Sequence, residues 1–411
     1  MALLELGIMF AAIAGVGGVA NRLGQSVIPF YIVAGMLLSE FVLGRVALPM
    51  LGTAYIPESE FIATGAELGI VFLLFFLGLE FNLDRLLDRR GQIGTAGTID
   101  LANFGVGLVL GWFVFGAFLP AFLLAGIVYI SSSAVITKSL IDLGWIANDE
   151  AEPLLGTLVY EDLFIAVYLA VASALVLGGG SVAAAAFDIA IAVGFILALL
   201  AVVAFGEPVF SRLVRTDNRE FVALRSIAAV VLIAGAALAL GVSEAVAAFF
   251  VGMAFSATEY VHEIEALLEP VRDTFAAVFF FWIGLVTDPL LFGDVIWLIA
   301  LAVLVTTPTK FVTGFFGGRA FDLNTRRSTR VALGMTTRGE FSLIIATIAV
   351  SGAEAGVFDA ALAATLNAFA VGYVLVMAIL GTTLMQYSEP FEAAAMSWLG
   401  GSTGETETGR L

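Results

Sequence analysis

Residues 153–178 read PLLGTLVYEDLFIAVYLAVASALVLG, an apolar run that contains two adjacent acids, Glu161 and Asp162. A run of about 20 apolar residues is long enough to cross the hydrocarbon core of a bilayer as one helix. The acids lie some eight residues inside this run, a depth of about 12 Å at the helical rise. The stretch therefore predicts a membrane-spanning helix with two carboxylates within the membrane.

The rest of the chain has the same apolar character. Of its 411 residues, 61% are hydrophobic and 13% charged, and the mean hydropathy is +1.05. A soluble domain is about half apolar and a quarter charged, and its interior cannot bury such an excess. Residues 1–20 lack the basic start and the cleavage site of a signal peptide, so we expect them to span the membrane as well. The composition predicts an all-α membrane protein.

Hydropathy predicts about thirteen transmembrane helices. They lie near residues 2–20, 26–43, 61–82, 96–118, 120–142, 153–178, 182–206, 220–240, 243–258, 270–288, 292–317, 329–352 and 360–386. With this count, thirteen arginines lie in the loops of one side, whereas Arg45 alone lies in those of the other. The positive-inside rule then places the N-terminus outside the cell membrane and the C-terminus in the cytoplasm.

Three similarities between the halves of the chain predict an internal repeat. Phe76-Leu77-Gly78-Leu79 resembles Trp282-Ile283-Gly284-Leu285, 34–36 (AGM) resembles 251–253 (VGM), and one helix in each half is interrupted by polar residues. Two six-helix units, at about 1–178 and 220–386, keep these features in order. A single linker helix, 182–206, separates the units, so the second is expected to be inverted, which is typical of transporters. Residues 1–388 would form this transmembrane domain, and 389–411 a short, disordered cytoplasmic tail.

The residue content excludes several classes of function. There is no cysteine and one histidine, His262, so neither thiol chemistry nor a histidine metal cluster is expected. The net charge of −17 does not suit a nucleic-acid-binding protein. No nucleophile–base pair or GxGxxG nucleotide-binding module is found, so we expect neither an enzyme nor a cofactor.

The acids Glu161 and Asp162 are candidate ion-binding residues, because carboxylates inside a membrane are costly and are usually functional. Lys310 lies in another apolar span, and a buried ammonium needs a carboxylate, so Glu161 or Asp162 is its expected partner. The alternatives are a pair of acids at headgroup level and a lysine that reaches the interface. Other acids lie nearer to predicted helix ends and are expected to be interfacial or structural: Glu67, Glu80, Asp100, Glu244 and Asp273.

Two predicted helices contain polar clusters that are expected to interrupt them, Ser131–Lys138 and Thr336–Ser342. Hydroxyl groups can satisfy the backbone where a membrane helix unwinds, and the half-helices then direct their dipoles at a central ion. The charges of Lys138, Arg338 and Glu340 would offset those dipoles. Helix packing through small polar residues is the alternative.

Six stretches, found in order along nearly the whole chain, resemble one family. They are IVAGMLL (32–38), ELGI (67–70), FFLGLEFN (75–82), SSSAVIT (131–137), FFFWIGL (279–285) and RGEFSL (338–343). In these stretches the chain resembles the monovalent cation:proton antiporters of the Kef-like and Nap-like branch of the sodium/hydrogen exchanger superfamily. The resemblance implies a homodimer, each protomer having a dimerisation domain and a mobile six-helix core with two crossed, discontinuous helices.

The resemblance also implies roles for single residues. Asp162 is similar to the carboxylate that binds cation and proton, with Ser132 as a further candidate ligand of the monovalent cation. Glu161 stands where electrogenic relatives have a second aspartate, and Lys310 resembles its salt-bridge lysine. The Glu–Asp pair departs from the family's Asp–Asp, Asn–Asp or Gln–Asp, which leaves the stoichiometry open. The candidate residues of the two crossings are Ser132, Ser133, Thr137, Lys138, Arg338 and Glu340.

Together these features predict an antiporter that exchanges Na⁺ or K⁺ for H⁺ by alternating access, with cation and proton competing for Asp162. The expected partners are these two ions, the lipid bilayer and a second copy of the chain. A sodium-coupled organic-anion symporter of related inverted-repeat fold is one alternative. A cation channel is another.

Overall fold

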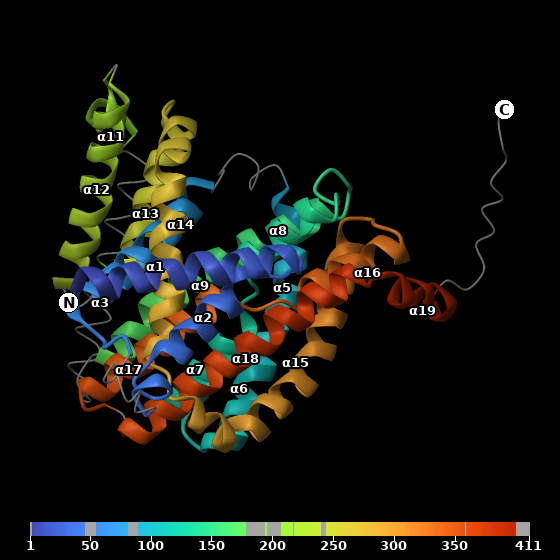
Figure 1. The fold of residues 1–411 in the computed structure, drawn as a ribbon. Helices are drawn as coiled ribbons and strands as arrows, with labels where there is room; N and C mark the ends of the chain where they lie inside the picture. Colours follow the sequence, from blue (N-terminus) through green and yellow to red (C-terminus); the bar gives the residue numbers. More distant parts are fainter. Residues whose placement is uncertain are drawn as a thin grey trace.

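The computed structural model describes residues 2–45, 55–80, 89–177, 194, 207–216, 218–239, 244–357 and 359–399. Helices form all the regular secondary structure of these residues (Figure 1). The first half contains α1 (Ala2–Arg22), α2 (Val27–Leu38), α3 (Glu60–Glu80), α5 (Arg90–Asp100), α6 (Ala102–Phe115), α7 (Phe118–Tyr129), α8 (Ser133–Asp142) and α9 (Ala151–Leu177). The second contains α11 (Glu207–Val214), α12 (Arg219–Ala239), α13 (Glu244–Ser256), α14 (Val261–Leu285), α15 (Phe292–Ala320), α16 (Thr325–Gly334), α17 (Glu340–Glu354), α18 (Ala360–Gln386) and α19 (Glu389–Leu399).

The helices confirm the predicted class of an all-α membrane protein. In the described residues, eight helices are long and apolar enough to cross a bilayer, and Phe118–Tyr129 and Ala247–Ser256 are shorter apolar helices. The predicted linker helix 182–206 falls outside the described residues, apart from position 194. The total of thirteen therefore stays a prediction.

The helices pack in two groups. The outer group is α1–α3 and α11–α14, in which α3 packs against both α13 and α14, and α2 packs against α14. The core group is α5–α9 and α15–α18, in which α15 packs against α5, α16 and α18, and α9 packs against α5 and α17. Each group takes helices from both halves of the sequence, as an interlocked pair of repeats requires.

Four glycines allow helices of the outer group to pack with their backbones in direct contact. A Cβ atom on Gly35 of α2 would collide with the backbone of α14, and one on Gly284 would collide with the backbone of α2. Gly78 of α3 and Gly252 of α13 are related in the same way. The repeat pairs Gly35 with Gly252 and Gly78 with Gly284, so it converts one close crossing into the other. The two contacts thus support the inverted repeat predicted from sequence.

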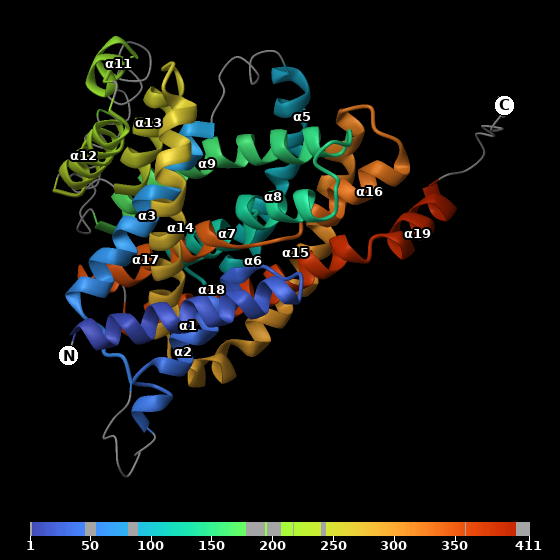
Figure 2. The ribbon, with the colours of Figure 1, turned by 45° about the horizontal axis from the view of Figure 1, so that its top comes forward.

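The two polar clusters break their helices, as predicted. One helix stops at Tyr129 and resumes as α8 at Ser133, and the other stops at Gly334 and resumes as α17 at Glu340. Helices α7 and α17 lie side by side (Figure 2), and a Cβ atom on Gly339 would collide with the side chain of Ser132. The core group therefore contains two crossed, discontinuous helices.

The C-terminal segment differs from the prediction of a disordered tail. Residues 389–399 form helix α19, which packs against α16 (Figure 1). Glu392 in its first turn accepts hydrogen bonds from Arg326 Nε (2.6 Å), Arg330 Nε (2.7 Å) and Ser388 Oγ (2.7 Å). The prediction judged the composition of the tail alone, whereas ion pairs to α16 stabilise this helix. Residues 400–411 lie outside the described part of the chain.

Candidate functional site

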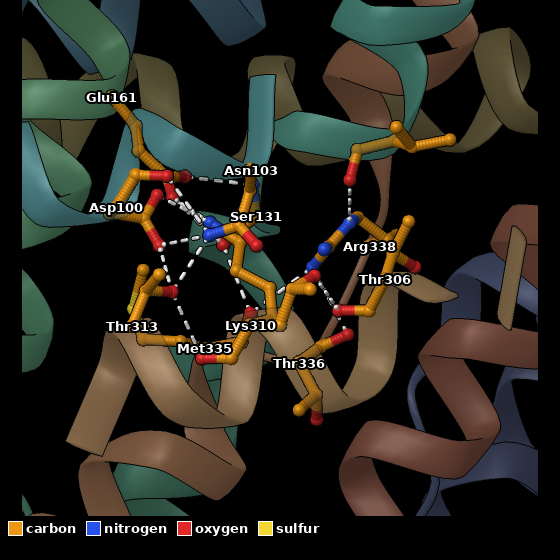
Figure 3. A network of polar contacts seen from close by, with 12 residues as sticks. Asp100, Asn103, Ser131, Glu161, Thr306, Lys310, Thr313, Met335, Thr336 and Arg338 are labelled. Carbon is orange, nitrogen blue, oxygen red and sulfur yellow. Dashed lines mark hydrogen bonds and ion pairs between the residues drawn. The ribbon is translucent and has the colours of Figure 1, made fainter. Parts of the chain in front are cut away.

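The ion pair predicted between Lys310 and an acid of the run 153–178 is present, and its partners are 149 positions apart in the sequence. Lys310 Nζ of α15 lies 2.5 Å from Glu161 Oε1 of α9, and both side chains are completely buried (Figure 3). Glu161 is therefore the carboxylate that neutralises Lys310, out of the two partners that the sequence allowed. The alternatives of headgroup-level acids and a snorkelling lysine do not fit this burial.

A third charged residue, Asp100, joins the pair, although its position near a predicted helix end indicated an interfacial residue. Asp100 Oδ2 lies 2.6 Å from Lys310 Nζ, and Asp100 is 1% exposed. The prediction was wrong because the small and polar residues 90–95 were not counted as helix, so Asp100 was expected near a helix end, although α5 already begins at Arg90. An acid four residues inside the predicted span 96–118 was the signal that could have identified it.

The first helix break supplies donors to Glu161. The Ser131 N–H donates to Glu161 Oε2 (2.7 Å), and the Ser131 hydroxyl lies 3.0 Å from Oε1 and 3.2 Å from the Met335 carbonyl in the second break. An unwound helix leaves such backbone groups without intrahelical partners, and here one of them binds a carboxylate. Glu161 thus connects Lys310 to the first break, and Ser131 connects Glu161 to the second.

Asp162 occupies the neighbouring position of α9 and is 5% exposed. Adjacent helix residues point about 100° apart, so Asp162 and Glu161 face different neighbours of α9. That helix packs against α5, α7, α8, α15, α16 and α17 of the core group, and also against α13 of the outer group. Asp162 is thus a buried carboxylate on the helix that touches both broken helices.

The acid of the second crossing binds the serines of the first. Ser132 Oγ donates to Glu340 Oε2 (2.7 Å), and Ser133 Oγ donates to Glu340 Oε1 (2.8 Å). Glu340 begins α17 and Ser133 begins α8, so the carboxylate lies at the positive ends of two helix dipoles. Thr137 is partly buried one turn further along α8, and the Lys138 side chain is outside the described part of the chain.

Arg338 performs the complementary role at the negative ends. Its Nε donates to the Val128 carbonyl near the end of α7 (2.9 Å). Its Nη1 lies 3.1, 3.1 and 2.7 Å from the carbonyls of Met335, Thr336 and Thr337 after α16. The side chain is fully buried. A guanidinium here satisfies carbonyls that lack helical partners and offsets both helix dipoles.

The sequence is similar to those of known membrane transporters. Residues 8–387 match the family model described as sodium/hydrogen exchanger, transmembrane. The K⁺/H⁺ antiporter subunit KhtU of Bacillus subtilis (strain 168) is 38% identical over 390 residues, 94% of this chain and 93% of the relative. The ammonium/H⁺ antiporter subunit AmhT of Alkalihalophilus pseudofirmus is 30% identical, with 88% of this chain and 94% of the relative covered.

A solved structure has a similar fold. The sodium proton antiporter MjNhaP1 from Methanocaldococcus jannaschii matches with a TM-score of 0.71 at 15% identity, over 93% of this chain and 99% of that chain.

Proposed function

This chain belongs to the sodium/hydrogen exchanger family and is a monovalent cation/proton antiporter, and we propose that Asp162 and Glu161 are the carboxylates through which it exchanges the two ions. The single observation that carries this assignment is the fully buried ion pair of Glu161 with Lys310, next to Asp162 and at the crossing of two broken helices. Buried charges at such a position are costly for stability and are retained for transport.

In the proposed mechanism, Asp162 binds the cation and the proton in competition. One carboxylate does not hold both at once, so it releases the cation on one side of the membrane and returns with a proton. The site faces the two sides in turn as the core group moves against the outer group, which is alternating access. Competition at one site then couples the two fluxes without a further device.

Ser132 is proposed as a second ligand of the cation. Its hydroxyl donates to Glu340 and accepts the Val135 N–H (3.2 Å). A hydroxyl oxygen has two lone pairs, so one remains for a cation. Oxygen ligands suit Na⁺ and K⁺, and the sodium, potassium and ammonium in the names of the similar proteins are all monovalent cations.

Transport by reconstituted protein tests the assignment of Asp162. Proteoliposomes with an acidic interior and a pH-sensitive dye would receive Na⁺, K⁺ and Li⁺ in turn. We expect at least one of them to dissipate the pH gradient with wild-type protein and none to do so with Asp162→Asn. Asp294→Asn, an exposed change in the first turn of α15, should transport normally. Cation-dependent proton flux through Asp162→Asn would exclude Asp162 as the exchange carboxylate.

The same assay separates the remaining alternatives. A channel would pass the cation without counterflow of protons, and a sodium-coupled organic-anion symporter would need an organic substrate and leave the dye unchanged. Membership of an exchanger family favours neither. Coupled loss of the pH gradient on adding a cation alone is the expected result.

Membrane topology and assembly are part of the same proposal. The protein is placed in the cell membrane as a homodimer, with its N-terminus outside and its C-terminus in the cytoplasm. The arginine distribution supports this orientation, and the resemblance to the exchangers supports the dimer. Because the chain has no cysteine, a single cysteine introduced near either end can be labelled with an impermeant maleimide on intact cells. Labelling at the C-terminal end would contradict the orientation.

A further inference from the structure

Lys310 has two carboxylate partners, and the proposed mechanism uses only one of them. Its Nζ lies 2.5 Å from Glu161 Oε1 and 2.6 Å from Asp100 Oδ2, and each of the three side chains is at most 1% exposed (Figure 3). An ammonium has three N–H donors, so it binds both acids at once. The second partner therefore needs a role of its own.

The Asp100 side chain is hydrogen-bonded to residues of α6 and α15, which are not the two crossed, discontinuous helices. Its Oδ1 accepts hydrogen bonds from Asn103 Nδ2 (3.1 Å) and Thr313 Oγ1 (3.1 Å), and Asn103 Nδ2 also donates to Thr313 Oγ1 (2.7 Å). Thr313 lies one turn beyond Lys310 on α15. Asp100, Asn103 and Thr313 thus tie the lysine to the contact of α15 with α5 and α6.

Glu161 has different surroundings. Its donors besides Lys310 are the backbone and hydroxyl of Ser131, in the break between α7 and α8. Ser131 also contacts the Met335 carbonyl in the other break. Glu161 is thus attached to the crossing where the cation is proposed to bind, whereas the Asp100 side chain is attached to α6 and α15.

We propose that Asp100 is a positioning residue of the exchange site, which retains Lys310 on α15 so that Glu161 can leave the ammonium and take part in ion binding. This inference rests on the proposed function of Glu161 and Asp162. Without Asp100, each departure of Glu161 would leave the ammonium buried without a counter-charge, which is strongly unfavourable. With Asp100 present, the lysine keeps one ion pair throughout the cycle.

The charges of the cluster make its protonation sensitive to Asp100. One ammonium compensates only one of two carboxylates, so the cluster of Asp100, Glu161 and Lys310 has a surplus negative charge that favours uptake of a proton. Within the described part of the chain, the other titratable or charged groups around it are Tyr129, whose ring centre lies 5.0 Å from Lys310 Nζ, Tyr160 and Asp162 on α9, and Arg338 at the crossing. Removing the charge of Asp100 leaves a neutral pair.

The test is the pH profile of cation/proton exchange by Asp100→Asn in proteoliposomes. Asparagine keeps the shape of the side chain but removes the charge. The neutral pair takes up a proton less readily, so we expect the midpoint of the profile to move to lower pH by about one unit. Because Glu161 is then the only charged partner of Lys310 among the described residues, we also expect the maximal rate to fall by about tenfold.

A second variant, at a neighbour of Asp100, should shift the midpoint in the opposite direction. Thr313→Val keeps every charge but removes a donor to Asp100, so the ionised cluster is less stabilised and its proton is held more tightly. The midpoint should move to higher pH. Opposite shifts in the two variants are the signature of an electrostatic role, which a packing defect would not produce. Asp294→Asn, exposed on the same helix as Lys310, should keep the wild-type profile and rate.

Each outcome decides for or against the inference. Unchanged midpoints, shifts of the same sign, or a folded Asp100→Asn protein without transport at any pH would overturn it. Thermal unfolding in detergent shows whether Asp100→Asn is folded. If it is not, Thr313→Val decides alone: a midpoint at higher pH supports the inference, and an unchanged midpoint rejects it. Asp162→Asn in parallel separates the two proposals, since transport through that variant contradicts the exchange site itself.

Discussion

The two halves of the chain build similar crossings but contribute opposite charges to the ion-pair cluster around Lys310. The acids Asp100 and Glu161 belong to the first half and their partner Lys310 to the second, whereas at the crossings the second half supplies both the cation Arg338 and the acid Glu340. The last helices of the predicted repeats differ most. Helix α9 carries two buried acids, whereas α18 has no charged residue.

This difference indicates a division of work within an approximately symmetric scaffold. Repetition provides two half-helix pairs whose broken ends meet at one place, and the chemistry depends on a few charges that the repeat does not share. In α18 the buried polar groups serve packing: Tyr373 is hydrogen-bonded to Thr306 of α15 (2.6 Å), and Asn367 donates to Thr287 (3.3 Å). Changes at the charged positions should therefore affect transport, and changes at the symmetric positions should affect stability.

The largest effect is expected from Lys310→Met, which removes the cation that the second half supplies to two acids of the first. Breaking a buried ion pair on one side costs about 3–5 kcal/mol, and we expect transport to fall by more than tenfold. Two acids without an ammonium hold a proton more tightly, so any remaining activity should have its midpoint at higher pH. Proton flux measured against pH in proteoliposomes checks this. An unchanged profile would argue against the pairing with Glu161.

The glycine crossings should respond alike because the repeat relates them. Gly35→Ala and Gly78→Ala each place a methyl group against backbone, which cannot move aside as a side chain can, and overpacking of this kind costs about 1–3 kcal/mol. Both variants should lower the thermal unfolding temperature in detergent by similar amounts. Gly15→Ala in α1, where nothing lies within 4 Å of the new atom, is the control. A large loss at only one crossing would contradict their equivalence.

A smaller effect is expected at the first break from Ser131→Ala. The variant removes the hydroxyl that lies 3.0 Å from Glu161 but keeps the Ser131 N–H that donates to the other oxygen. A hydrogen bond to a charged group contributes about 1.5–3 kcal/mol, and the remaining donor retains part of it. We expect a rate lowered three- to tenfold and a slightly lower thermal unfolding temperature. Equal activity of variant and wild type would show that the N–H alone is sufficient.

The smallest effect should lie outside the membrane-spanning helices, at α19. Burial opposes ionisation of Glu392, but hydrogen bonds from Arg330, Arg326 and Ser388 outweigh it, and the pKa of Glu392 is lowered. A carboxylate with a lowered pKa stabilises the folded state above its unfolded value, about 4.3, and this contribution is lost as the pH falls through the lower folded value. We therefore expect α19 to detach from α16 only in strong acid.

Hydrogen exchange of residues 389–399 against pH measures this detachment. Glu392→Gln should weaken protection of α19 already at neutral pH and remove its acid dependence, whereas Glu389→Gln, an exposed acid on the same helix, should behave as wild type. Acid-dependent protection that persists in Glu392→Gln would mean that another group holds the helix.

The sequence by itself determined the class of fold, the two interrupted helices and most of the candidate site. Long apolar runs leave a chain no stable place except a bilayer, and charges within such runs are rare enough to stand out individually. For the same reason Glu161, Asp162, Lys310 and Arg338 could be identified as candidate site residues from the sequence alone. Hydropathy is a local property, and it failed where helices contain small polar residues or depend on distant partners.

Only the tertiary structure decided which charges meet. Asp100 and Lys310 are 210 positions apart, and their contact depends on α5 beginning at Arg90, before the apolar run that marked this helix. The choice of Glu161 over Asp162 as partner of Lys310 depends on how α9 is rotated against α15, because neighbouring residues point about 100° apart. Helix α19 is stabilised by ion pairs between its Glu392 and two arginines of α16, Arg326 and Arg330. Such pairings depend on packing between distant segments, and no local pattern encodes them.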